Sequence, residues 1–367
     1  MKDKNKKKSS GQTLTLLIAI ATGAALGILS MRMPDDLPYV LILLIYMYAA
    51  IFVHVIIHEA GHLVFGLLSG YSFTSFRIFS FMWIKENGKL RLKRLSLAGT
   101  AGQCLMTPPE LVDGKMPVVL YNLGGSIMNL LTGGIFLVIS LFCTEGSLVW
   151  LAMLAFSLIG VMTALMNGIP MRTAMIDNDG YNAMSLRENT EAMRAFWLQL
   201  SVASETAKGV RLKDMPAEWF ELPSDEAMNN GMVAACGVFA ANRLMEEGRL
   251  EEADGLMARL LDGDFKVSGL HRNLMTLDRI YFELIGEARR DVVDGMLTAE
   301  LKKFMKTMKT FPSVIRVEYA IALIHENAPA KAKTILTRFD KCAKTYPYQN
   351  DIESERELIK MAESRYS

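Results

Sequence analysis

The sequence predicts a mainly α-helical membrane protein that carries a small β-hairpin element and a cytoplasmic helical domain. Hydrophobic residues make up 51% of the 367 residues, and the mean hydropathy is positive at +0.22. In the first half of the chain they gather in long uncharged runs. The second half is charged, and its apolar residues recur with the period of amphipathic helices. Between the runs, an Asn-Gly pair separates two strand-like stretches.

Four apolar runs predict about four transmembrane helices. Each lacks Asp, Glu, Lys and Arg, and each reaches or approaches the roughly 20 residues that a helix needs to cross a bilayer. They are residues 13–30, 37–57, 116–143 and 146–171. The first follows a basic head and could be a signal peptide. Because no convincing small-residue cleavage site precedes the second run, an uncleaved anchor is the favoured interpretation.

The distribution of lysine and arginine predicts how these helices are oriented. Five lysines lie in the first ten residues, and seven basic residues lie between residues 71 and 117. The short connections after the first and third runs are poor in basic residues. Basic segments stay on the cytoplasmic side. We therefore expect a multi-pass cell-membrane protein whose N terminus, middle segment and C terminus are cytoplasmic.

The middle segment, residues 75–97, predicts a hairpin with its turn at Asn87-Gly88. In its second strand, Leu90 and Leu92 alternate with basic residues, so one face is apolar and the other is basic. Such a strand could lie at the membrane surface, with its basic face near anionic lipid head groups. An ordinary solvated hairpin explains the pattern equally well.

The chain is predicted to divide near residue 186, into a membrane-embedded core (1–186) and a cytoplasmic helical domain (187–367). The stretch GRLEEADGLMARLL (248–261) has the spacing of a tetratricopeptide repeat, and residues 328–339 offer a second candidate. A plain helical bundle is the alternative. A protein partner could bind this domain, whereas a net charge of +1 gives no argument for nucleic acid. The four cysteines are far apart and predict isolated thiols.

The stretch VIIHEAGHLVFG (55–66) places ionisable residues inside the second apolar run. His58, Glu59 and His62 form an H-E-x-x-H pattern, which on a helix puts two imidazoles on one face where they can share a metal ion. His58 lies about 20 residues, or roughly 30 Å, along a helix that begins near Pro38. It is therefore expected near the cytoplasmic boundary, where an ionisable residue is a functional candidate. The alternative is a polar pair that satisfies a helix–helix hydrogen bond.

Two imidazoles leave a zinc ion short of its usual three protein ligands plus water. The segment MNGIPMRTAMIDNDGYNAM (166–184) follows the fourth run and offers Asp177 and Asp179. Because the fourth helix enters from outside, this segment is expected at the cytoplasmic level of His58. His54 lies one turn before His58, and we interpret it as a hydrogen-bonded interhelical histidine and not as a ligand.

The third run carries small and amide residues at helical spacing. Asn122, Gly125, Ser126, Asn129 and Gly133 share one face. Small residues let membrane helices approach closely, and buried amides need partners. Asn129 is the candidate for holding a substrate backbone or an oxyanion, with a purely interhelical hydrogen bond as the alternative.

Taken together, these motifs resemble the site-2 proteases, a family of intramembrane zinc metalloproteases, over about residues 38–186. His58-Glu-Ala-Gly-His62 matches the first motif of the family. Asn167-Gly-Ile-Pro170 followed by Asp179-Gly180 resembles the second, and Gly125-Ser-Ile-Met-Asn129 resembles its G-x-x-x-N. The resemblance implies zinc held by His58, His62 and Asp179. It also implies Glu59 as general base and cleavage of membrane-anchored protein or peptide substrates in or near the membrane.

The sequence departs from the family pattern in three respects. The gap between Pro170 and Asp179 is longer than in the common form, no PDZ-like insertion is apparent, and the C-terminal domain is not part of the shared core. We favour Asp179 over Asp177 because Gly180 would let the backbone turn sharply behind it. Asp177 would cap the next helix, which is expected near Tyr181.

Two other classes of function are open at this stage. One is a zinc-binding membrane scaffold that lacks proteolysis and recruits partners through its helical domain, although Glu59 is not needed for zinc binding alone. The other is a small transporter, which four spans without charged pathway residues fit poorly. For a protease, the hairpin at residues 75–97 is expected to hold the unwound substrate by strand addition.

Overall fold

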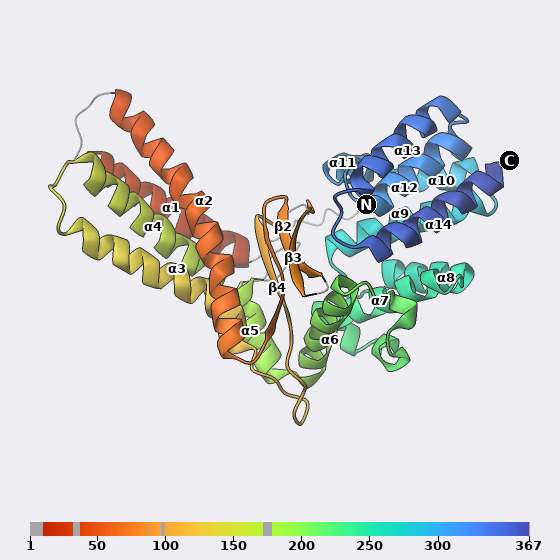
Figure 1. Ribbon diagram of the computed structural model, residues 1–367, viewed down its shortest axis with the longest axis horizontal. Helices are drawn as coiled ribbons and strands as arrows, with labels where there is room; N and C mark the ends of the chain where they lie inside the picture. Colours follow the sequence, from red (N-terminus) through yellow and green to blue (C-terminus); the bar gives the residue numbers. More distant parts are fainter. Residues whose placement is uncertain (1–9, 32–36, 87, 97–99, 172–177, 367) are drawn as a thin grey trace, which may run out of the picture. The chain divides into compact units, whose positions relative to one another are not determined.

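The computed structural model describes residues 10–31, 37–86, 88–96, 100–171 and 178–366, which fold into two compact units (Figure 1). The first unit combines residues 1–72 with 116–189. The second combines residues 73–115 with 190–367. The described chain is mainly helical and includes a small antiparallel sheet. The division into a membrane core and a cytoplasmic domain stays a prediction. The hairpin segment, which the predicted boundary near residue 186 placed with the core, packs instead with the C-terminal helices.

Five helices build the described part of the first unit. They are α1 (Ser10–Ser30), α2 (Leu37–Leu68), α3 (Val119–Ser140), α4 (Leu148–Gly168) and α5 (Asp179–Glu188). Helices α2, α3 and α4 pack against one another, and α1 packs against α4. Helix α5 contacts both α3 and α4. The start of α5 is therefore held beside the helices that carry the predicted site.

Three helices are long and apolar enough to cross a membrane: Pro38–Leu68, Val119–Ser140 and Leu148–Gly168. The apolar part of α1 found among the described residues, Thr13–Ile28, is shorter. Three of the four predicted spans thus correspond to helices that are long and apolar enough to cross a membrane, although the second helix continues past its predicted end at residue 57 to Leu68. The fourth span stays a prediction.

Helices α2 and α3 touch backbone to backbone at two glycines. A Cβ atom added to Gly61 would lie 2.3 Å from the carbonyl oxygen of Gly124, and one added to Gly124 would lie 2.6 Å from that of Gly61. No larger side chain fits at either position without moving the helices. Because Gly61 precedes His62, this close approach brings the histidine-bearing turn of α2 directly against α3.

The sheet of the second unit has the strand order β3-β2-β1-β4. Its strands are β1 (Ser72–Ile78), β2 (Phe81–Glu86), β3 (Lys89–Arg94) and β4 (Gly102–Thr107). Strands β2 and β3 are antiparallel, with Glu86 opposite Lys89. The predicted hairpin is therefore confirmed. Gly88 turns the chain with a φ of +76°, and Asn87 lies outside the described residues.

The two faces of the hairpin differ in their surroundings. Met82 and Ile84 are fully buried and belong to the hydrophobic core that the C-terminal helices form. On the other face, Leu92 lies opposite Trp83 and is 58% exposed. Leu90 is 60% exposed. Leu90 and Leu92 of β3 therefore share one face, as predicted. The contact with the core is made by the apolar residues Met82 and Ile84 of β2.

The rest of the second unit is helical. Its main helices are α6 (Thr190–Ala207), α7 (Gly231–Glu246), α8 (Leu250–Asp262), α9 (Gly269–Ile285), α10 (Arg290–Met296), α11 (Ala299–Thr307), α12 (Pro312–Ala320), α13 (Pro329–Ala343) and α14 (Gln349–Tyr366). Gly248 makes the turn between α7 and α8 with a φ of +76°. Ala253 and Met257, which suggested a repeat, are buried. The helical character is as predicted, while the tetratricopeptide assignment stays a prediction.

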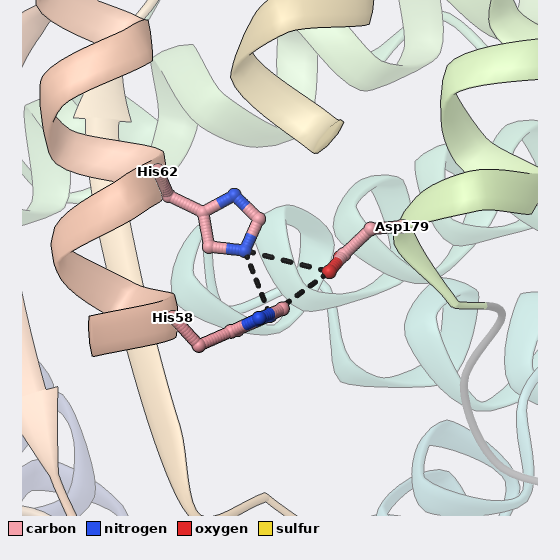
Figure 2. Close-up of side chains that lie close together, drawn as sticks. All are labelled: His58, His62 and Asp179. Carbon is pink, nitrogen blue, oxygen red and sulfur yellow. Dashed lines mark hydrogen bonds and ion pairs between the residues drawn. The ribbon is translucent and has the colours of Figure 1, made fainter. Parts of the chain in front are cut away.

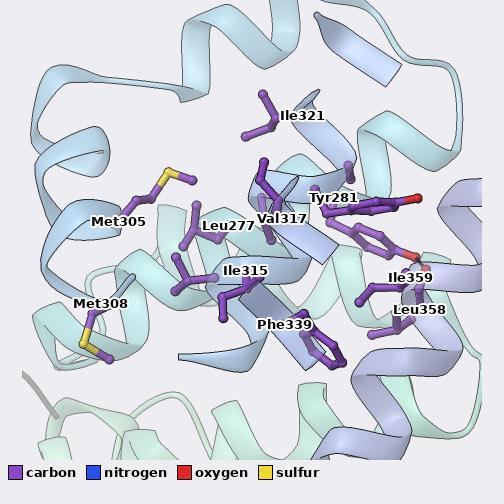
Figure 3. Packing of buried hydrophobic residues seen from close by; sticks show 14 of the residues in the cluster. Leu277, Tyr281, Met305, Met308, Ile315, Val317, Ile321, Phe339, Leu358 and Ile359 are labelled. Atoms are coloured by element: carbon purple, nitrogen blue, oxygen red, sulfur yellow. Dashed lines mark hydrogen bonds between the residues drawn. The ribbon is translucent and has the colours of Figure 1, made fainter. Parts of the chain in front are cut away.

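The core of the second unit packs apolar side chains such as Tyr281, Val317 and Leu358 (Figure 3), and an ionic cluster on Arg316 is buried beside Tyr281. The Arg316 side chain is fully buried, and it donates hydrogen bonds to Asp278 and, at 2.7 Å, to Glu355. Its guanidinium carbon lies 4.3 Å from the centre of the Tyr281 ring. These partners come from α9 and α14, so one arginine of α12 ties three helices together. Breaking such a buried pair is costly because the remaining charges have no partner.

We expect Arg316→Met to destabilise the second unit by about 3–5 kcal/mol, since it leaves Asp278 and Glu355 buried without their cation. The matched control is Arg356→Met. The Arg356 side chain is 44% exposed in its ion pair with Asp340, and an exposed pair contributes about 0–1 kcal/mol. Denaturant unfolding of the detergent-solubilised full chain, followed by circular dichroism, measures both. Equal losses for the two variants would contradict the assigned role of Arg316.

Candidate metal centre

Three predicted ligands converge in the first unit (Figure 2). His58 and His62 lie one turn apart on α2, and Asp179 is the first residue of α5. The two Nε2 atoms are 3.2 Å apart. Asp179 Oδ2 lies 3.0 Å from Nε2 of His58 and 3.4 Å from Nε2 of His62. Asp179 is more than a hundred positions away from the two histidines in the sequence, yet the three ligand atoms form one small triangle.

The size of this triangle matches a tetrahedral metal site. Ligand atoms bonded to a tetrahedral zinc ion at about 2.0–2.1 Å are separated from one another by about 3.3–3.4 Å. The three distances between His58, His62 and Asp179, from 3.0 to 3.4 Å, are close to that spacing. The donor set can therefore occupy one face of a tetrahedron and leave its fourth corner for water or substrate.

The hydrogen bonding of His62 shows which of its ring nitrogens can bind a metal. Its Nδ1 lies 2.8 Å from the carbonyl oxygen of Tyr121 on α3. A carbonyl can only accept, so Nδ1 carries the proton, and the neutral ring has its lone pair on Nε2. That lone pair faces the Asp179 carboxylate, which also only accepts when ionised. A cation between them removes the repulsion between these acceptors.

Asn178 determines where Asp179 lies. Its side-chain oxygen accepts hydrogen bonds from the backbone N–H groups of Met171 at 2.9 Å and Tyr181 at 3.0 Å. Its amide nitrogen donates to the carbonyl oxygens of Met166 and Ile169. Asn178 is thus the N-cap of α5 and also binds the end of α4. The sequence analysis missed this residue, although an asparagine just before a helix is a known N-cap signal.

Gly180 does not make the sharp backbone turn that the sequence predicted. The backbone makes no left-handed turn there, because Gly180 lies inside α5 and is not among the glycines with positive φ. Instead, a Cβ at this position would lie 2.2 Å from the carbonyl oxygen of Gly168. Glycine is needed so that α5 can pack against the end of α4. The rival ligand, Asp177, lies outside the described residues.

Glu59 follows His58 on α2 and is only 8% exposed. It is close enough to His62 for the two side chains to interact electrostatically. Its carboxylate is not among the three groups that converge. A glutamate in this position of the pattern is suited to accept a proton from a water molecule.

Asn129 lies at the centre of α3, and its side chain is fully buried between two histidines. Its amide group is 3.0 Å from Nδ1 of His54 and 3.2 Å from Nδ1 of His58. His54 is also fully buried and lies 2.9 Å from the carbonyl oxygen of Phe156 on α4. The interhelical hydrogen bonds predicted for His54 are present. Both ends of the Asn129 amide contact histidine, and its contact with substrate stays a prediction.

The motifs behind the family resemblance occupy different places in the structure. His58, His62 and Asp179 meet, and Gly125 leaves room for the His58 ring, since a Cβ there would lie 2.5 Å from it. Asn167, by contrast, donates to the carbonyl oxygen of Thr163 in its own helix. Comparisons with protein-family models, curated proteins and solved structures find no match to this chain.

We expect Asp179→Ala to abolish tight metal binding, because it removes the only described carboxylate that meets both imidazoles. Asp177→Ala is the comparison and should keep metal binding, because the carboxylate that meets both imidazoles belongs to Asp179 and the N-cap of α5 is Asn178. Metal content of the two purified proteins, measured by atomic emission after dialysis, decides between them. Loss of metal from the Asp177 variant alone would show that the ligand is misassigned.

Proposed function

We propose that the protein is an intramembrane zinc metalloprotease that hydrolyses membrane-anchored substrates within or near the cytoplasmic side of the bilayer. One observation carries the proposal: His58, His62 and Asp179 converge beside Glu59 near the end of a membrane-length helix. Charged and metal-binding groups are costly inside a membrane and are retained there for function. The resemblance of the motifs to site-2 proteases points to the same activity.

Zinc is the metal that suits this donor set best. Two imidazoles and one carboxylate are a known zinc ligand set, in which a fourth position stays open for catalysis. When bound, zinc polarises a scissile carbonyl and makes water a competent nucleophile near neutral pH. The protein's part is to hold the three ligands, and the N-cap Asn178 and the glycine contacts of α2, α3 and α5 support that geometry.

Glu59 is proposed as the general base. It is buried on the same helix as both histidines and does not belong to the converging ligands. A carboxylate there can take the proton from the attacking water and deliver it to the leaving amine. Metal binding alone does not require this residue, so its presence favours hydrolysis over a purely structural site.

The shared core of the second unit supports the proposed topology. Met82 and Ile84 of β2 pack with the C-terminal helices in one core. In addition, the backbone N–H of Arg94 donates to the carbonyl oxygen of Thr345 at 2.8 Å. This shared core supports a topology in which residues 73–115 and 190–367 lie on the same side of the membrane. Helices α3 and α4, which connect them, then cross it as a pair, and the basic residues of the middle segment favour the cytoplasmic side.

Glu59→Gln should retain zinc and lose peptide cleavage, because the ligands are intact and the base is absent. We would compare membrane proteomes of cells that express the wild-type or the variant protein, together with zinc content of the purified chains. Single-span substrates should accumulate with Glu59→Gln. The control is Glu145→Gln, which changes an exposed acid between α3 and α4. Unchanged processing by Glu59→Gln would favour a zinc-binding scaffold over a protease.

The C terminus should be cytoplasmic. Fusions of alkaline phosphatase and of green fluorescent protein after the last residue keep both units complete, and only the fluorescent fusion should be active. The same pair of reporters placed within residues 108–115 should give the same answer, because residues 73–115 form one compact unit with the C-terminal helices. If alkaline phosphatase were the active reporter at both positions, the proposed topology would be inverted. If different reporters were active at the two positions, the two segments could not form one compact unit.

A further inference from the structure

A continuous chain of hydrogen-bonding groups connects three helices to the His58 ligand. It runs from the carbonyl oxygen of Phe156 on α4 to His54 on α2, at 2.9 Å. It continues to the Asn129 amide on α3, at 3.0 Å, and ends at Nδ1 of His58, at 3.2 Å. His54 and Asn129 are both 0% exposed. Water therefore cannot substitute for any partner along this chain.

The carbonyl of Phe156 determines the direction of every proton in the chain. Since it can only accept, Nε2 of His54 carries a proton. A neutral His54 then has its lone pair on Nδ1, which needs a donor. The only donor that Asn129 offers is its NH2 group, so that group faces His54. The alternative is a doubly protonated His54. Within the described residues this buried cation would have hydrogen bonds only to an amide and a carbonyl, so its desolvation would be costly.

The orientation of the Asn129 amide in turn determines the state of His58. With NH2 toward His54, the amide oxygen faces Nδ1 of His58. This is the structure's arrangement after a rotation of the amide by 180°, which exchanges its oxygen and nitrogen and moves no other atom. An oxygen acceptor requires a proton on Nδ1 of His58. The His58 lone pair is then on Nε2, which lies 3.0 Å from Asp179 Oδ2.

We propose that His54 and Asn129 are positioning residues whose ordered protons present the Nε2 lone pair of His58 to the metal. This inference rests on the metal site in the proposed function and goes beyond it, because it assigns both residues a task. His62 needs no such chain, since the backbone carbonyl of Tyr121 fixes its proton directly. His58 and His62 are therefore held in the same tautomer by different partners. Only the tautomer of His58 depends on other side chains, those of Asn129 and His54.

Two glycines hold the rings of this chain in place. A Cβ on Gly160 of α4 would lie 2.5 Å from a ring carbon of His54. A Cβ on Gly125 of α3 would lie 2.5 Å from a ring carbon of His58. Both rings are thus packed closely against glycine backbone. Close packing of this kind restricts ring rotation, which a precise ligand orientation requires.

The test uses the full-length protein in detergent, with Co²⁺ as a spectroscopic probe of the metal site. Asn129→Leu removes the acceptor for His58 and should weaken Co²⁺ binding by about 10–100-fold, the usual effect of losing the partner of a metal-bound histidine. Asn122→Leu is the matched control. Asn122 is also buried on α3, but it donates to the carbonyl oxygen of Val118 in its own helix, so its loss should leave the affinity unchanged.

Asn129→Asp tests the proposed proton order. Aspartate can accept from Nδ1 of His58 but cannot donate to it, so Co²⁺ affinity should be close to that of the wild type. If the amide instead donates to His58 in the wild type, the metal-free His58 carries its proton on Nε2, which nitrogen-15 spectra of labelled histidines would show, and the inference would be overturned. Nitrogen-15 spectra of labelled histidines give an independent readout: His54 should be neutral with its proton on Nε2. A doubly protonated His54 would also refute the proposal.

These outcomes separate the inference from the function on which it rests. If the wild type and Asn122→Leu bind no Co²⁺, the metal site itself fails, and the tautomer of His54 still tests the proton order. If the wild type binds Co²⁺ and Asn129→Leu binds it equally well, the metal site stands and the positioning role is wrong.

Discussion

The first unit is organised around the convergence of two imidazoles and one carboxylate in an apolar environment. Nε2 of His58, Nε2 of His62 and Oδ2 of Asp179 lie within 3.4 Å of one another. When all three atoms are acceptors, as in the proposed metal site, a cation among them offsets their repulsion, which water screens little in an apolar surrounding. The contacts around the site therefore have two tasks: they bring the acceptors together, and they direct the ring protons away from them.

Small residues perform the first task. Gly61 and Gly124 let α2 and α3 meet backbone to backbone, and Gly180 lets α5 approach the end of α4. Without these contacts the imidazoles and the carboxylate would be too far apart to share an ion. Acceptors fixed in the helices perform the second task. The Tyr121 carbonyl orients His62, and the chain from Phe156 orients His58.

Local patterns in the sequence were sufficient to predict the features that depend on neighbouring residues. The H-E-x-x-H spacing predicts that His58 and His62 share a helix face, because that depends only on helical periodicity. The Asn-Gly pair likewise predicts the hairpin. Choosing Asp179 required the order of the helices and a family resemblance, and the physical reason given for Gly180 was wrong because its close contact is with Gly168, distant in sequence.

Features that depend on long-range packing could not be read from the sequence. Asn178 was overlooked between two aspartates because its four hydrogen bonds include partners on the preceding helix. The two contacts of the Asn129 amide lie on α2, so its position on an apolar helix allowed several roles. The burial of Met82 and Ile84 by helices from the far end of the chain has no local signal.

The discontinuous second unit also has a consequence for biosynthesis. The sheet is translated before α3, but its apolar face is covered by helices that end as late as α14. At about 5–20 residues per second, the roughly 260 residues that separate them take on the order of 13–50 s to synthesise. During that interval two further membrane-length helices must also leave the ribosome. The nascent chain therefore exposes Met82 and Ile84 for much longer than a hairpin takes to form, which leaves this apolar face open to aggregation until α14 has been translated.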